Sequence, residues 1–153
     1  MAAPFDLIFG ISAVAFNLLI AGVFLATRAG KMARVRRFGT GLVALGLPFG
    51  VVLYHTLTAG RNLYVRAALA VVLAYILTEL ILDFILQYDF RAKWITHVPY
   101  IALEYGAFFA LIYVAFTISD FLGWVVSVTF WMALAALIYY LAGRKKNSNS
   151  KKK

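Results

Sequence analysis

The amino-acid sequence predicts an all-α integral membrane protein, a bundle of five transmembrane helices with the N-terminus outside and the C-terminus in the cytoplasm. Three observations lead to this prediction. Hydrophobic residues make up 64% of the 153 residues, which is more than a soluble domain of this size can bury. They are gathered in long runs, and most of the 15 lysines and arginines lie between or after these runs. This arrangement is typical of helices that cross a bilayer.

The lengths of the apolar runs give the number of spans. A helix needs about 20 apolar residues to cross the hydrocarbon core. The last run is too long for one helix, and Ser119 and Asp120, followed by Gly123, divide it into two. One transmembrane domain, residues 1–143, therefore precedes a polar, basic tail, 144–153, that we expect to be disordered. The predicted spans are 4–27, 38–57, 63–86, 98–118 and 121–142.

The positions of the basic residues predict the orientation. Thirteen of them fall in three segments that lie on one side of a five-span bundle, whereas only Arg61 and Arg66 lie on the other side. Because cytoplasmic loops carry the excess of lysine and arginine, the three segments should be cytoplasmic. They are 28–37, 87–97 and 143–153. We expect a multi-pass protein of the plasma (inner) membrane.

The formal net charge of +9 raises the question of nucleic-acid binding. The charge is concentrated beside the spans, mainly in 28–37 and 143–153, where it sets topology and attracts anionic lipid headgroups. We therefore expect membrane lipids as partners and no nucleic acid.

The chain has no cysteine, so disulfides and thiolate metal ligands are excluded. No cofactor-binding motif is present, and we expect no cofactor.

The second span is rich in glycine and contains Pro48. Gly46 and Gly50 form a GxxxG pattern, which places two small residues on one helix face and lets another helix approach closely. The pattern fits close packing within the monomer, which we favour, or the contact of a homo-oligomer. Pro48 removes a backbone hydrogen bond and is expected to kink the span.

Carboxyl groups inside the third and fourth spans give the strongest indication of function. Residues 75–91, YILTELILDFILQYDFR, place Tyr75, Glu79 and Asp83 four residues apart, and therefore on one helix face. His97, Tyr100 and Glu104 share one face of the next span. Glu79 and Glu104 would each lie about 10 Å inside the cytoplasmic ends of their spans.

These two spans are joined by a short connection, so we expect them to be antiparallel neighbours. If their polar faces meet, one acidic site forms near the cytoplasmic side. Carboxyl groups in a membrane span are costly and mark functional sites more often than chance. We therefore expect a site that binds a cation, a proton or an amine-bearing ligand. The predicted ligand-binding residues are Tyr75, Glu79, Asp83, His97, Tyr100 and Glu104.

Three classes of function fit this pattern. The first is a small transporter or channel-like subunit, which the acidic site favours. The second is a structural or assembly subunit of a larger membrane complex, in which the carboxyl groups only join helices. The third is a membrane-embedded acid–base enzyme that acts on a lipid. The enzyme is the least favoured, because the chain contains neither HExxH nor GxSxG.

Overall fold

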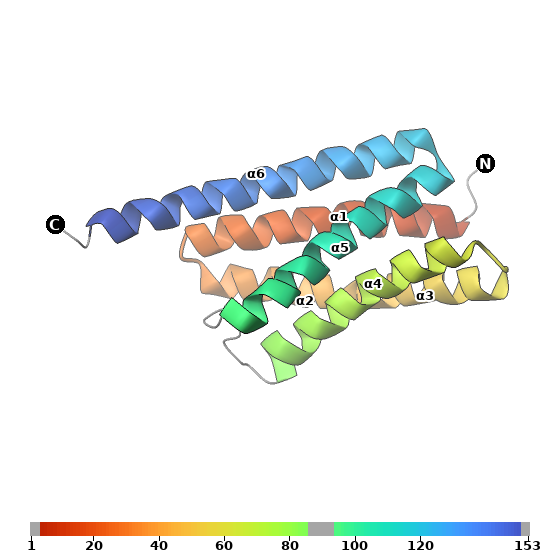
Figure 1. The fold of residues 1–153 in the computed structure, drawn as a ribbon, viewed down its shortest axis with the longest axis horizontal. Coiled ribbons are helices and arrows are strands. Elements are labelled where there is room, and N and C mark those ends of the chain that lie inside the picture. Colours follow the sequence, from red (N-terminus) through yellow and green to blue (C-terminus); the bar gives the residue numbers. More distant parts are fainter. Residues whose placement is uncertain (1–3, 86–93, 151–153) are drawn as a thin grey trace.

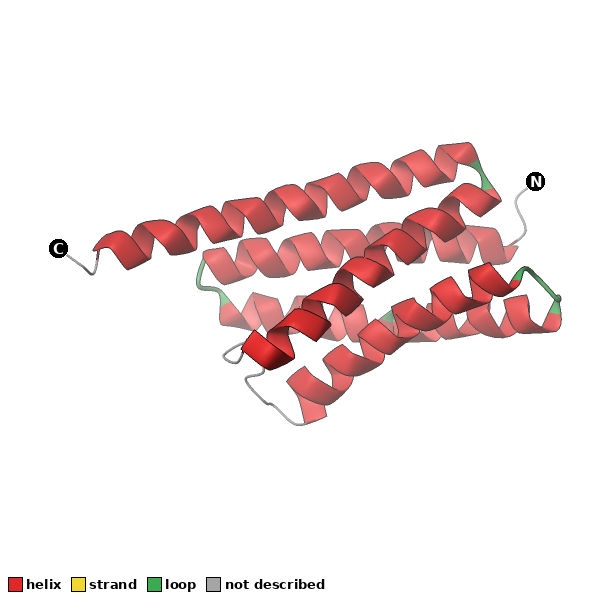
Figure 2. Cartoon of the chain, viewed as in Figure 1, coloured by secondary structure: helices red, strands yellow, loops and turns green. Residues whose placement is uncertain are grey.

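The computed structural model of the protein describes residues 4–85 and 94–150, without the side chains of residues 83–84, 94–97 and 144–150. The described residues form helices joined by short turns (Figure 2). Six are α-helices, and a π-helix continues the fourth. They are α1 (Pro4–Arg28), α2 (Met32–Ala44), α3 (Gly46–Thr58), α4 (Leu63–Glu79), the π-helix η1 (Leu80–Ile85), α5 (Trp94–Ile118) and α6 (Asp120–Ser150).

The structure confirms that the described part of the chain is helical, with five segments long and apolar enough to cross a membrane. The second span consists of α2 and α3 together and begins at Met32, where the sequence predicts a start at residue 38. The segments are Pro4–Arg28, Met32–Thr58, Leu63–Leu82, Val98–Ile118 and Asp120–Gly143.

The helices pack side by side, and the two ends of the chain lie at opposite ends of the bundle (Figure 1). Helix α1 is central, since it contacts α2, α3, α5 and α6. We call the end that holds the α1–α2 turn the basic end, after Arg28, Lys31 and Arg34. The other end holds the α3–α4 and α5–α6 turns, and we call it the opposite end.

The turn between α1 and α2 is shorter than the sequence predicts, because helix continues through most of 28–37. Gly30 has a φ of +67°, a conformation that glycine adopts without steric cost. The Gly30 N–H donates to the carbonyl of Thr27 at 3.1 Å, and the Lys31 N–H donates to that of Ala26 at 3.0 Å. This pair of bonds is the Schellman arrangement that ends a helix.

The second span is interrupted at Leu45, three residues before Pro48. Proline has no N–H for the carbonyl of the residue four positions before it, here Ala44, and its ring crowds that carbonyl. The interruption is therefore the expected effect of Pro48.

The two glycines of the GxxxG pattern have different surroundings. A Cβ atom on Gly46 would lie 3.4 Å from Ile76 of α4, whereas one on Gly50 would have no atom within 4 Å. Gly46 thus packs within the chain, and Gly50 faces open space.

Helices α1 and α2 approach closely because each offers a glycine to a side chain of the other. A Cβ atom on Gly22 would lie 3.1 Å from the ring of Phe38, and one on Gly41 would lie 3.3 Å from Leu19. A larger side chain at either position would require the neighbouring side chain, Phe38 or Leu19, to move.

The centre of the bundle is an apolar core with aromatic rings. The fully buried residues include Phe9, Phe16, Phe49, Leu69 and Leu111. The ring of Phe16 has its centroid 5.6 Å from that of Tyr75 and 5.8 Å from that of Phe108, both in edge-to-face geometry, which aromatic pairs favour.

One buried polar contact joins the first and last spans. Asn17 of α1 donates to the carbonyl of Val126 at 3.1 Å and to the hydroxyl of Thr129 at 2.8 Å. Hydrogen bonds between transmembrane helices of this kind contribute on the order of 1 kcal/mol.

The last helix extends beyond its span. The sequence predicts a disordered tail from residue 144, whereas the backbone of α6 is helical as far as Ser150. No proline follows Gly143, and continuing an existing helix costs far less than starting a new one.

The close contact at Gly22 gives a test of this packing. Gly22→Val should lower the free energy of unfolding by about 1–3 kcal/mol, since the added methyl groups would overlap the Phe38 ring. Gly50→Val is the matched control, because a side chain there meets open space. Unfolding in mixed micelles measures both. Equal losses for the two variants would contradict the packing described. If Gly50→Val separates a homo-oligomer on a sizing column, Gly50 is a contact between copies.

Candidate functional site

The first part of the candidate site is a hydrogen-bonded cluster between α4 and α5. The hydroxyl of Tyr75 donates to Oε1 of Glu79 at 2.9 Å, one helical turn away. The hydroxyl of Tyr100 on α5 donates to the same oxygen, and the two hydroxyl oxygens lie 3.2 Å apart. The expected meeting of the two polar faces is therefore present at these three residues, which we call the Glu79 cluster.

The Glu79 cluster is deeply buried. The exposed fractions are 1% for Tyr75, 7% for Glu79 and 8% for Tyr100. A carboxyl group in this position is costly unless its oxygens receive hydrogen bonds. The two tyrosine hydroxyls supply them from two different helices, so the cluster also fixes α4 against α5.

The helix changes its geometry directly after Glu79. Residues Leu80–Ile85 form the π-helix η1, in which each N–H bonds five residues back, and such turns are frequent at functional sites. The predicted stripe from Tyr75 through Glu79 to Asp83 assumed α-helical spacing throughout, which holds only as far as Glu79. The side chain of Asp83 lies outside the described residues.

The second part of the candidate site is a narrow space beside Glu104, which we call the Glu104 pocket. Glu104 lies one turn after Tyr100 on α5 and is half-buried. The pocket has a volume of about 10 Å³, which is room for one water-sized group. Its walls come from α1, α5 and α6: Phe24, Glu104, Tyr105, Phe108, Phe130, Ala133, Leu134 and Leu137.

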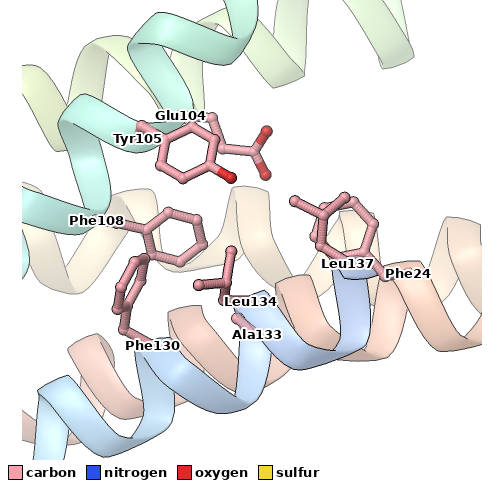
Figure 3. Close-up of a pocket in the computed structure, with 8 residues that line it drawn as sticks. All are labelled: Phe24, Glu104, Tyr105, Phe108, Phe130, Ala133, Leu134 and Leu137. Atoms are coloured by element: carbon pink, nitrogen blue, oxygen red, sulfur yellow. The ribbon is translucent and has the colours of Figure 1, made fainter. Parts of the chain in front are cut away.

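Figure 3 shows how these side chains lie. Phe108 and Phe130 stand at one end of the pocket, and Phe24 and Leu137 stand at the other. The carboxyl group of Glu104 and the hydroxyl of Tyr105 point to the same side. The rings of Phe108 and Phe130 meet edge to face, with centroids 5.2 Å apart, and this contact holds the wall in place.

The structure thus places four of the six predicted site residues. Tyr75, Glu79 and Tyr100 form one cluster, and Glu104 lies close enough to both tyrosines to interact with them electrostatically. Its own pocket, however, faces α1 and α6. The predictions for Asp83 and His97 concern side chains outside the described residues.

Sequence reasoning did not find the aromatic wall of the Glu104 pocket. A signal existed for Phe108, which lies four residues after Glu104 and so shares its helix face. Phe24 and Phe130 belong to spans far away in the sequence, and no local pattern indicates that they meet Glu104.

The two parts of the site offer hydroxyl and carboxyl oxygens in apolar surroundings. Among the side chains that the structure describes, which do not include those of Asp83 and His97, no group of three or more histidine, aspartate or glutamate residues is arranged to hold a metal ion. Carboxyl groups of this kind can take up a proton or pair with a small cation that donates hydrogen bonds.

The core separates the candidate site from the opposite end of the bundle. Phe16 lies against Tyr75, and Phe49 and Phe9 continue the aromatic contacts beyond it. At the opposite end itself, Arg61 and Asp6 form an ion pair at 3.2 Å. The site therefore lies in the half of the bundle that is nearer the basic end.

Comparison of the chain with models of protein families, with curated proteins and with solved structures gives no match.

Because Tyr75 and Tyr100 donate to the same oxygen of Glu79, we expect their substitutions to have non-additive effects on stability. Tyr75→Phe and Tyr100→Phe should each lower the free energy of unfolding by about 1–2 kcal/mol, because each removes one buried hydrogen bond. The double variant should lose more than the sum, since either hydroxyl alone still serves the shared oxygen. Unfolding in mixed micelles measures the cycle. Tyr64→Phe is the control, because Tyr64 is 69% exposed. Single variants as stable as the control would show that the cluster does not hold α4 to α5.

Proposed function

We propose that this protein is a small membrane transporter or channel-like subunit that binds a cation, a proton or an amine-bearing ligand at Glu79 and Glu104. The observation that supports the proposal is the presence of a carboxyl group on each of two neighbouring helices, Glu79 on α4 and Glu104 on α5, inside apolar segments. A carboxylate there costs several kcal/mol unless it has a partner, so its presence in a span indicates a functional site. The proposed binding residues also include Tyr75 and Tyr100, which contact Glu79.

The proposed orientation places the basic end, and therefore the candidate site, on the cytoplasmic side of the plasma (inner) membrane. The excess of lysine and arginine at this end supports it. Lys31, Arg34, Arg36 and Arg37 are exposed there. The span that begins at Met32 has 27 residues, about 40 Å of helix against a hydrocarbon core of about 30 Å. Its first turns therefore reach the layer of lipid headgroups, where the arginines meet anionic lipids.

Since the chain has no cysteine, single cysteines test this orientation directly. In intact cells, a membrane-impermeant maleimide should label Ser119→Cys, which is exposed in the α5–α6 turn. It should label Ala29→Cys, exposed in the α1–α2 turn, only after the membrane is permeabilised. The reverse pattern would place the candidate site on the outer side.

The apolar core argues against an open pore through one copy of the chain. Phe9, Phe16 and Phe49 are fully buried and lie between the site and the opposite end. Transport therefore requires either a rearrangement of the helices or a pathway between copies. Gly50 faces open space, and a second copy that packs there, next to Gly46, would form such a homo-oligomer.

The alternative is a structural or assembly subunit of a larger membrane complex. The two tyrosine bonds to Glu79 favour this alternative, since they give one oxygen of the buried carboxyl group two donors from the chain itself. A transporter and a structural subunit would respond differently to the removal of a carboxyl group. A transporter loses flux while the protein stays intact, whereas a structural subunit loses only stability or partners.

Flux through the reconstituted protein tests the proposal. In proteoliposomes, Glu79→Gln and Glu104→Gln should each abolish cation-dependent flux, because the neutral amide carries no negative charge to balance the cation and cannot accept a proton. Asp120→Asn, in an exposed position at the start of α6, should leave flux unchanged. Proton and potassium movements are followed with a pH-sensitive dye and an ion-selective electrode. Unchanged flux in both glutamine variants would overturn the proposed function.

A further inference from the structure

The turn between α3 and α4 is held by bonds of its own. Gly60 has a φ of +66°, which lets the chain reverse without steric cost. The Arg61 N–H donates to the carbonyl of Thr56 at 3.2 Å, and Nε of Arg66 donates to the carbonyl of Arg61 at 2.8 Å. The side chain of Asn62 caps the start of α4. These bonds keep α3 and α4 together as one unit, residues 46–79, which we call the hairpin.

Two side-chain contacts join the hairpin to the start of α1. Arg61 forms the ion pair with Asp6 at 3.2 Å. The ring of His55 stacks on that of Phe5, with centroids 3.7 Å apart and planes 15° apart. We call these two contacts the latch. Both lie at the opposite end of the bundle, where the α3–α4 turn comes near the N-terminus (Figure 1).

A closed space of about 10 Å³ adjoins the latch, which is room for one water-sized group. All four latch residues line it, and its other walls come from α1, α3, α4 and α5. Leu69 of α4 is one of these walls and is fully buried. The buried face of α4 continues from Leu69 through Val72 to Glu79. The latch therefore closes the end of the face that leads to the Glu79 cluster.

The hairpin is bounded by two interruptions of helix geometry. Before it, the second span is broken at Leu45, close to Pro48. After it, α4 passes into the π-helix η1 at Leu80. Helices bend at prolines and at π-turns, and hinge motions are absorbed at the ends of elements. Helix α1 contacts α2 and α6 more extensively than α3 or α5, so the boundary between α1 and the hairpin is the weaker one.

We propose that the hairpin is a lid that moves away from α1 at the opposite end, on hinges at Leu45 and η1, and that the latch holds it closed. The lid keeps its contact with α5 while the boundary with α1 opens. This inference rests on the proposed function, because the lid supplies the rearrangement by which the candidate site is reached from the opposite end.

Cysteine labelling tests the lid, because the chain has no cysteine of its own. Leu69→Cys places a thiol behind the latch, and its rate of reaction with a water-soluble methanethiosulfonate is measured in nanodiscs. Adding Arg61→Gln should raise this rate about two- to fivefold, the effect expected from loss of a partly exposed ion pair. Adding His55→Ala as well should raise the rate about tenfold or more, since both latch contacts are then lost.

Two matched controls separate opening of the lid from general loosening. Val126 is fully buried on α6, six residues after the start of its helix, as Leu69 is on α4. The labelling of Val126→Cys should not change in the latch variants. Arg66→Gln removes an arginine whose bond stays within the hairpin, and it should leave the labelling of Leu69→Cys unchanged.

Equal rates for Leu69→Cys with and without the latch would overturn the inference, and so would equal acceleration at Val126→Cys. In a second experiment, Phe5→Cys and His55→Cys are joined by a short bis-thiosulfonate. The cross-link should stop flux in proteoliposomes, and dithiothreitol should restore it. Continued flux through the cross-linked protein would overturn the lid. Faster labelling in the latch variants of a protein that shows no flux would keep the lid and overturn the proposed function.

Discussion

The free-energy cost of burying a carboxyl group inside an apolar span constrains how the helices pack in the half of the bundle nearer the basic end. Glu79 is 7% exposed, and its oxygen requires hydrogen bonds that lipid cannot give. Tyr75 supplies one from the same helix and Tyr100 supplies another from α5. Helices α4 and α5 must therefore keep the separation and rotation that let both hydroxyls reach one oxygen. The π-helix that follows Glu79 and the position of Glu104, one turn after Tyr100, both adjoin this contact.

The remainder of the bundle is held by contacts of a different kind. Gly22 and Gly41 let α1 and α2 approach, Asn17 ties α1 to α6, and Phe16 packs against Tyr75 and Phe108. Because α1 contacts four other helices, it connects the Glu79 cluster to the wall of the Glu104 pocket through Phe16 and Phe24.

Features of the structure that depend on the local pattern of residues could be predicted from the sequence. Runs of apolar residues predicted five apolar helical segments, and Pro48 predicted the loss of a backbone hydrogen bond in the second segment, whose helix is interrupted at Leu45. The spacing of Tyr75 and Glu79, together with Tyr100 on the next span, predicted the Glu79 cluster. The departures have physical reasons. The π-helix Leu80–Ile85 is not indicated by any pattern in the sequence. The prediction that Asp83 shares a face with Glu79 therefore used α-helical spacing. Phe24 and Phe130 reach Glu104 only through the packing of distant spans, which hydropathy does not reveal.

The central claim is that the membrane-embedded carboxyl groups respond to a ligand. Infrared difference spectroscopy of the carboxyl C=O stretch, on the protein in nanodiscs, tests it most directly. Glu79→Gln and Glu104→Gln assign the bands. We expect the Glu104 band to change with pH and on addition of a cation, while Asp120→Asn leaves this response intact. Carboxyl bands unmoved by pH or by any cation would contradict the account, and they would show that the carboxyl groups only join helices.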